Sequence, residues 1–209
     1  MADTEKEITI PAGTADLPAK LGVPEGAEKL VIFVHGTGSS RFSPRNNFVA
    51  ETLRGKGLAT LLFDLLTEEE DREYSRRFDI ELITGRILAA TGWVKEQYND
   101  MLLQYFGAST GSAAALKAVV TGDTEIGAVV SRGGRPDMVM EDLPQVTVPT
   151  LFIVGGKDVQ VKEMNERAFE KLGGKKSFEV IPGAGHLFEE EGKLEQVASL
   201  SADWFVNNP

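Results

Sequence analysis

Apolar positions along the chain fall into two alternating patterns. Short apolar runs, several of them rich in β-branched residues and bounded by glycine or proline, are typical of strands buried on both faces of a sheet. Longer stretches carry apolar residues at helical spacing. The runs predict strands at residues 29–35, 58–64, 101–106, 126–131, 149–155 and 177–181. The helical spacing predicts helices at residues 44–56, 79–98, 112–120, 161–172 and 194–206.

The first thirty residues follow a different pattern. Residues 5–10 alternate polar and apolar side chains, which predicts an edge strand. A turn at Pro11, Ala12 and Gly13 would let residues 17–21 pair with it. The charged stretch 65–78 is expected to form a solvated loop or a single helical turn.

Strands that alternate with helices imply a doubly wound α/β fold, with a mostly parallel sheet and helices on both faces. Ligands bind such sheets beyond the carboxyl ends of the strands. Length and the absence of repeats or linkers predict one domain over residues 1–209. Every glycine-rich loop of the chain would then lie at one edge of one sheet.

Charge and composition narrow the classes of partner. The net charge of −10 argues against nucleic acid or an anionic membrane as the partner. With no cysteine, disulfides, thiolate zinc sites and a cysteine nucleophile are excluded. The acidic first residues and the lack of a long apolar run make the cytoplasm the expected location. A small-molecule substrate and a monomer or homodimer are expected, with no cofactor and no metal.

Residues 107–111 read Gly-Ala-Ser-Thr-Gly, which is a G-x-S-x-G motif. An apolar run precedes it and a helical run rich in small residues follows. This strand–turn–helix context is typical of a nucleophile elbow, in which a tight turn holds the serine hydroxyl out at the edge of the sheet. The turn is too tight for large side chains, and we expect the glycines two before and two after the serine to relieve the clash, because glycine tolerates backbone angles that other residues avoid. Ser109 is therefore the candidate nucleophile.

Two later loops supply the partners that a serine nucleophile needs. Asp158 follows the strand at 149–155, and His186 follows the strand at 177–181. A histidine can take the serine proton, and a carboxylate orients the imidazole. The order Ser109, Asp158, His186 is that of the α/β-hydrolase triad.

Alternatives exist for the base and the acid of this triad. His35, the second histidine of the chain, ends a strand and is the alternative base. Asp64 and then Asp137 are the alternative acids.

The oxyanion hole is expected from two backbone amides. One belongs to Thr110, directly after the nucleophile, and the other to Thr37 in the glycine-rich loop after residue 35. Three arginines near the strand ends, Arg41, Arg132 and Arg135, are candidates for holding a carboxylate or phosphate of the substrate. Internal salt bridges, for instance Arg135 with Asp137, are the alternative interpretation.

These motifs resemble an α/β-hydrolase of the dienelactone-hydrolase-like group, from about residue 29 onward. The matching stretches are His35-Gly36-Thr37-Gly38, Gly107-Ala108-Ser109-Thr110-Gly111, Gly155-Gly156-Lys157-Asp158 and Gly183-Ala184-Gly185-His186. Finer stretches, residues 39–46 and 131–137, are similar to hydrolase domains that are sometimes joined to a phosphoribosyltransferase domain. Dienelactone hydrolases proper use a cysteine nucleophile, so the resemblance implies the fold and a serine hydrolase, but not dienelactone as the substrate.

Two other functions are alternatives to hydrolysis. Gly36-Thr37-Gly38-Ser39-Ser40-Arg41 begins like a dinucleotide fingerprint, but Arg41 stands where that motif needs a small residue. The same fold could also serve a non-catalytic or non-hydrolytic binding role. The sequence favours a serine hydrolase that cleaves a small ester or thioester through an acyl-enzyme on Ser109.

Overall fold

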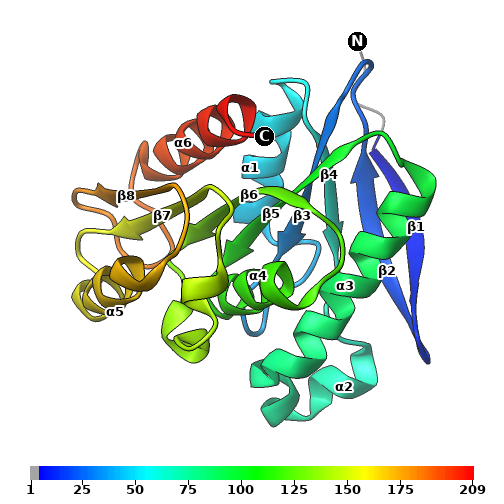
Figure 1. The fold of residues 1–209 in the computed structure, drawn as a ribbon, viewed down its shortest axis with the longest axis horizontal. Helices are drawn as coiled ribbons and strands as arrows, with labels where there is room; N and C mark the ends of the chain where they lie inside the picture. The colour runs from blue at the N-terminus through cyan, green and yellow to red at the C-terminus, as the bar shows by residue number, and fades with distance from the viewer. Residues whose placement is uncertain (1–4) are drawn as a thin grey trace.

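The computed structural model describes residues 5–209 and contains one eight-stranded sheet with helices on both faces (Figure 1). The strand order is β1-β2-β4-β3-β5-β6-β7-β8. Strands β3 to β8 run parallel, and β1 and β2 are antiparallel to their neighbours. The strands are β1 (Glu5–Ala12), β2 (Ala15–Gly22), β3 (Lys29–Val34), β4 (Ala59–Phe63), β5 (Leu102–Ala108), β6 (Ile126–Arg132), β7 (Thr150–Gly155) and β8 (Lys176–Ile181). The predicted doubly wound, mostly parallel sheet is confirmed.

Helices cover the two faces unequally. Figure 1 shows α1 and α6 on one face and α3, α4 and α5 on the other. The helices are α1 (Pro44–Arg54), α2 (Glu68–Arg72), α3 (Ile80–Gln97), α4 (Thr110–Thr121), α5 (Val159–Lys171) and α6 (Lys193–Asn207), with 3₁₀ turns η1 (Tyr74–Phe78), η2 (Pro136–Val139) and η3 (Leu143–Gln145). Since side chains alternate along a strand, Ile32 joins the core under α3 and α4, and Phe33 joins the core under α1 and α6.

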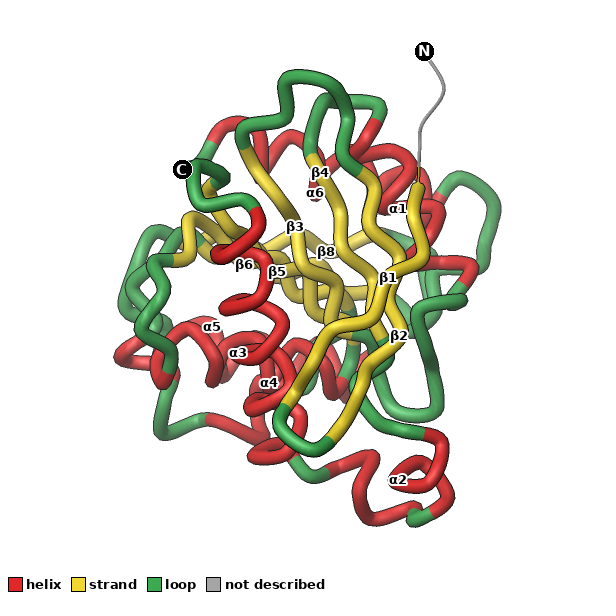
Figure 2. The backbone as a smooth tube through the Cα atoms, turned by 90° about the vertical axis from the view of Figure 1, so that its right-hand side faces the viewer, coloured by secondary structure: helices red, strands yellow, loops and turns green. Residues whose placement is uncertain are grey.

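The β1–β2 hairpin confirms the predicted edge pairing but moves its turn. Pro11 pairs with Asp16 and Ala12 with Ala15, so the turn is residues 13–14 and not Pro11 to Gly13. A two-residue hairpin turn needs a positive φ, which Gly13 supplies at 70°. Pro11 fits the outer strand because β1 has no further neighbour to which it could donate a hydrogen bond. Figure 2 shows the hairpin turn directed toward the end of the molecule that carries α2.

The charged stretch after β4 forms α2 and the turn η1. Thr67 and Glu70 form a capping box: Glu70 N donates to Thr67 Oγ1 at 3.2 Å, and Thr67 N donates to Glu70 Oε2 at 2.9 Å. Glu70 also pairs with Arg86 of α3 at 2.7 Å, and Arg86 donates to the carbonyl of Ala12. These bonds fasten α2 to α3 and to the hairpin.

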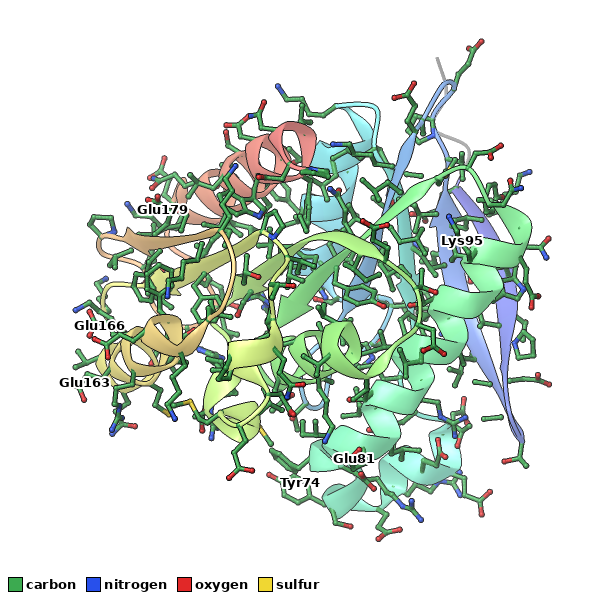
Figure 3. The ribbon with its side chains drawn as sticks, viewed as in Figure 1. Tyr74, Glu81, Lys95, Glu163, Glu166 and Glu179 are labelled. Atoms are coloured by element: carbon green, nitrogen blue, oxygen red, sulfur yellow. The ribbon has the colours of Figure 1, made fainter. Side chains whose placement is uncertain are left out.

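Glu81 of α3 and Glu163 and Glu166 of α5 are exposed acidic residues on the surface (Figure 3). None of the helices in residues 5–209 combines the length and the apolar character that crossing a bilayer requires.

Two glycine substitutions test how the sheet and its helices are packed. A Cβ on Gly107 of β5 would lie 2.4 Å from Ser112 Cα, whereas a Cβ on Gly85 of α3 would meet nothing within 4 Å. We expect Gly107→Ala to lower the free energy of unfolding by about 1–3 kcal/mol. Gly85→Ala should raise it by about 0.5–1 kcal/mol because alanine favours the helix. Urea unfolding measures both, and equal midpoints for the two variants would contradict this packing.

Candidate active site

A tight turn of the backbone lies between β5 and α4, at Ser109. The strand ends at Ala108, the helix begins at Thr110, and Ser109 has φ 51° and ψ −123°. Such angles cost a non-glycine residue about 1–3 kcal/mol, so the surrounding packing must hold the turn. Among residues 5–209, Ser109 and Phe188 are the non-glycine residues with positive φ.

At Gly107 and Gly111 there is no room for a side chain. A Cβ on Gly107 would lie 2.4 Å from Ser112 Cα, and one on Gly111 would lie 2.3 Å from Val34 O. The expectation that these glycines relieve a clash in a tight turn is confirmed. Neither glycine has a positive φ, so the expectation that they also supply unusual backbone angles was wrong. Their small size lets α4 press against β5 and β3, and the strained angles fall on Ser109 itself.

Asp158 and His186 come together at the ends of β7 and β8. His186 Nδ1 lies 2.7 Å from Asp158 Oδ2. The two loops are in close contact: Lys157 N donates to Ala184 O at 2.9 Å, and a Cβ on Gly155 would lie 2.4 Å from Gly185 O. The His186 side chain is 38% exposed and that of Asp158 18%, so a ligand can reach the imidazole while the carboxylate is shielded.

The loop after β6 connects Ser109 to the histidine. Ser109 N donates to Arg132 O and Arg135 N donates to Ser109 O, both at 3.1 Å. A Cβ on Gly133 would lie 3.4 Å from the His186 ring. Ser109 and His186 therefore flank one short loop, although no hydrogen bond joins them within the described chain. Catalytic hydrogen bonds are often long in a free enzyme and tighten when the substrate binds.

Glu190 fastens the loop that carries His186. Its two carboxylate oxygens accept from Gly185 N at 3.0 and 3.1 Å. This backbone hydrogen bond holds the pKa of Glu190 below its usual value. Lys157 adds an ion pair at 3.5 Å from the neighbouring loop.

His35, the alternative base, has both ring nitrogens occupied. Nδ1 lies 3.0 Å from Gly36 O, and Leu65 N donates to Nε2 at 3.2 Å. Because Nε2 accepts, Nδ1 carries the proton and the ring is neutral. Burial lowers the pKa of His35 and favours this neutral form. The ring joins the loop after β3 to the loop after β4.

The alternative acids also have partners elsewhere. Asp64 accepts from Arg41 N at 2.7 Å and pairs with the Arg41 guanidinium. Asp137 makes a two-point ion pair with Arg135, at 2.8 and 2.9 Å. Of the three candidate carboxylates, Asp158 is the one bonded to a histidine.

Thr37 and Thr110, whose amides are the predicted oxyanion donors, lie side by side. Thr37 N donates to Thr110 Oγ1 at 3.0 Å, and the two hydroxyls lie 2.9 Å apart. The Thr110 amide belongs to the first turn of α4, where amides have no partner within the helix. A substrate oxygen would have to replace the Thr110 hydroxyl at the Thr37 amide, so this donor pair stays a prediction.

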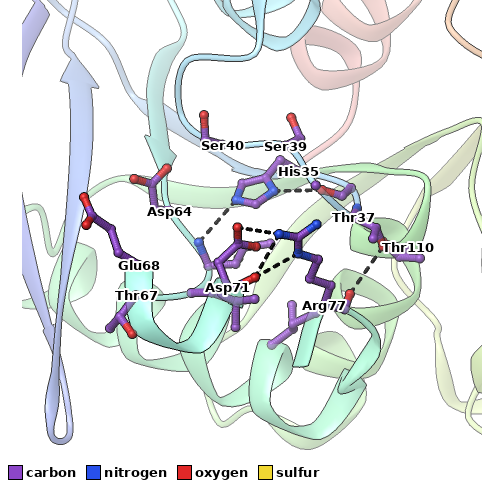
Figure 4. Close-up of a pocket in the computed structure, with 15 residues that line it drawn as sticks. His35, Thr37, Ser39, Ser40, Asp64, Thr67, Glu68, Asp71, Arg77 and Thr110 are labelled. Atoms are coloured by element: carbon purple, nitrogen blue, oxygen red, sulfur yellow. Dashed lines mark hydrogen bonds and ion pairs between the residues drawn. The ribbon is translucent and has the colours of Figure 1, made fainter. Parts of the chain in front are cut away.

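A cavity of about 180 Å³ opens beside these threonines, on the β3 and β4 side of the elbow (Figure 4). Leu65, Leu66 and Ile83 form its apolar part, and Glu68 and the Asp71–Arg77 ion pair lie at its acidic part. The sequence did not predict this cavity, because the charged residues 65–78 indicate a solvated loop or a single helical turn. The position of residues 65–78 directly after a buried strand could have indicated the cavity.

The three candidate arginines differ in their surroundings. Arg41 pairs with Asp64 and, at 3.5 Å, with Glu7, and Arg135 pairs with Asp137, so the salt-bridge interpretation holds for both. Arg132 is 6% exposed, and its guanidinium has no hydrogen-bond or ion-pair partner in residues 5–209.

Two neighbours define the setting of Arg132. Burial first, and repulsion from Arg45 second, lower the pKa of Arg132 to about 10, which leaves it charged at neutral pH. Its guanidinium carbon lies 5.8 Å from the centroid of the Phe188 ring.

No three histidine, aspartate or glutamate side chains gather as metal ligands in the described part of the chain.

No protein-family model matches the chain. A crystal structure named as a dienelactone hydrolase from Anabaena variabilis is 48% identical, with a TM-score of 0.94, over 98% of this chain and 97% of that one. Est1E from Butyrivibrio proteoclasticus shares the fold at 19% identity and a TM-score of 0.82, over 96% of this chain and 97% of that one.

Curated relatives are longer. Two Mycobacterium tuberculosis proteins, provisionally named phosphoribosyl transferases, are 50% identical over 206 residues. These cover 98% of this chain but 46% of the relatives, so the chain spans about half of their length.

The buried His35 predicts a specific pH dependence of stability. Its folded pKa is lowered, so the unfolded chain takes up this proton first as the pH falls. The free energy of unfolding should therefore decrease as the pH falls below about 6.5, and this contribution should be complete above that value. Urea unfolding from about pH 7 to pH 5 should show this slope in the parent and in His186→Gln, and a smaller slope in His35→Gln. The same slope in all three proteins would contradict the assignment.

Proposed function

The chain belongs to the dienelactone-hydrolase-like group of α/β-hydrolases, and we propose that within this group it is a serine hydrolase that cleaves small esters or thioesters. The full sequence contains no cysteine, so Ser109 is the nucleophile in this proposal. Asp158, His186 and the amides of Thr37 and Thr110 complete the machinery.

The proposed reaction proceeds in two steps. Ser109 Oγ attacks the carbonyl carbon while His186 Nε2 accepts its proton, and the carbonyl oxygen becomes an oxyanion held by the two amides. His186 returns the proton to the leaving alcohol or thiol, and an acyl-enzyme remains on Ser109. Water, deprotonated by His186, then releases the acid and restores the serine.

One observation carries the proposal: the 2.7 Å contact between His186 Nδ1 and Asp158 Oδ2, beside a strained Ser109. A carboxylate at Nδ1 fixes that proton there, which leaves Nε2 free as the base. The other histidine has both nitrogens engaged, and the other candidate acids pair with arginines.

The cavity on the β3 side supports a small substrate group. At about 180 Å³ it is smaller than most sites for drug-sized ligands. Thr37 and Thr110 lie at its edge, so a group bound there sits next to the proposed oxyanion hole. Its apolar wall of Leu65, Leu66 and Ile83 suits a short acyl or alkyl chain.

The curated relatives are named as transferases, but this chain aligns with only 46% of their length. The 98% of this chain that aligns with them includes the residues of the proposed hydrolase site. We therefore assign hydrolysis, and not phosphoribosyl transfer, to these 209 residues.

The orienting role of Asp158 gives the sharpest kinetic prediction. Asp158→Asn should lower kcat for a small activated ester such as p-nitrophenyl acetate by about 10⁴, because the imidazole loses its fixed tautomer. KM should change little. Asp137→Asn, which removes an equal charge from the Arg135 ion pair, is the matched control and should keep kcat within about tenfold of the parent.

Steady-state kinetics over a panel of esters and thioesters supply the measurement. Equal kcat values for parent and Asp158→Asn, in a parent that turns over, would contradict the proposed triad. A folded parent without turnover of any panel member would favour a non-catalytic binding role on the same fold.

A further inference from the structure

The Thr37 amide, one of the two proposed oxyanion donors, already has a partner in the free protein. It donates its hydrogen to Thr110 Oγ1 at 3.0 Å. Thr110 lies in the first turn of α4 and is 4% exposed, whereas Thr37 is half-buried in the loop after β3. Both residues line the cavity of about 180 Å³ (Figure 4). The bond therefore occupies the donor that the proposed mechanism gives to the substrate.

The hydroxyl groups of the two threonines close a ring with this bond. Thr37 Oγ1 lies 3.3 Å from the carbonyl oxygen of Arg77, which can only accept, so Thr37 is the donor there. A hydroxyl has one hydrogen to donate. In the 2.9 Å contact between the two hydroxyls, Thr110 is therefore the donor and Thr37 the acceptor. Thr110 accepts from the amide of Thr37 and donates to its hydroxyl, which fixes its side chain at two points.

The segment that follows β4 holds the last acceptor of this ring in place. Arg77 Nη2 donates to both the carbonyl and the carboxylate of Asp71, each at 2.8 Å. Arg77 Nη1 lies 3.9 Å from the position that a Cβ on Gly38 would take, so the arginine side chain lies against the loop that carries Thr37. The Arg77 carbonyl is thus held beside Thr37 by bonds within its own segment.

We propose that the Thr110 hydroxyl is a latch on the oxyanion hole. It closes the Thr37 amide in the free protein and must rotate away before that amide can hold the substrate's oxygen. This inference rests on the proposed function for the role of the Thr37 amide, and on the three hydrogen bonds for the latch itself. The Thr110 hydroxyl is a positioning group, because it acts through the Thr37 amide.

The latch distinguishes a neutral carbonyl oxygen from an oxyanion. Hydroxyl and carbonyl oxygens are both neutral acceptors, so a substrate gains little when its carbonyl replaces the Thr110 hydroxyl at the Thr37 amide. A hydrogen bond to a charged acceptor is roughly twice as strong. The developing oxyanion therefore displaces the hydroxyl. The bond from Thr37 is then made mainly in the transition state, which is where binding accelerates a reaction.

Hydrogen exchange of the Thr37 amide, measured by NMR, tests the latch without any turnover. The amide should exchange about two- to tenfold more slowly in the parent than in Thr110→Val, which keeps the shape of the side chain but removes the acceptor. Thr110→Ala repeats the comparison with a smaller side chain, and Thr110→Ser should restore slow exchange. Equal exchange in the parent and in the variants without a hydroxyl would overturn the latch.

The matched control lies at the other end of the same helix. Thr121 is exposed, and its hydroxyl donates to the carbonyl of Lys117. Thr121→Val removes a hydroxyl from α4 outside the cavity, so the Thr37 amide should exchange in this variant as it does in the parent. Faster exchange of the Thr37 amide in Thr121→Val as well would assign the effect to the helix and overturn the latch.

Reaction rates test what the latch does. The parent must break one hydrogen bond that Thr110→Val does not make, so kcat/KM for p-nitrophenyl acetate should rise about two- to tenfold in this variant. The rate constant for labelling by a fluorophosphonate should rise by a similar factor. An unchanged or lower kcat/KM would overturn the latch, and a fall would identify the hydroxyl as an oxyanion donor. Slow exchange that depends on Thr110, in a protein that neither cleaves an ester nor reacts with the probe, would support the bond and refute the proposed hydrolysis instead.

Discussion

The close approach of α4 to β5 and β3 is the constraint on which the rest of the structure depends. Gly111 lies against the Val34 carbonyl and Gly107 against Ser112, so nothing larger than glycine fits at either position. The helix can therefore start immediately after Ser109, and the strained angles at Ser109 are held by this packing. In the proposed mechanism, the Thr110 amide in the first turn of this helix then binds the carbonyl oxygen of the substrate.

The loops at the strand ends on the two sides of this turn differ in their surroundings. On the β3 and β4 side, His35 joins two loops as a neutral ring, and the cavity beside Thr37 is acidic and partly apolar. On the β6 side, Arg132 is buried beneath the loop that carries His186.

The alternation of strands and helices, the edge hairpin and the Asp158–His186 contact could all be predicted from sequence, because they depend on local patterns and on chain order. The need for small residues in the tight elbow could be predicted as well. The atoms of Val34 and Ser112 that exclude a side chain there could not, since these contacts exist only in the folded chain. The same holds for the candidate arginines Arg41, Arg132 and Arg135. All three stand near strand ends, and only packing shows which of them finds a carboxylate.

An activated Ser109 is the central claim, and covalent labelling tests it most directly. A fluorophosphonate probe reacts with a serine only when a base and an oxyanion hole are in place. Intact mass should show one adduct on the parent and none on Ser109→Ala or His186→Ala. No adduct on the folded parent, or an adduct that persists in Ser109→Ala, would contradict the account.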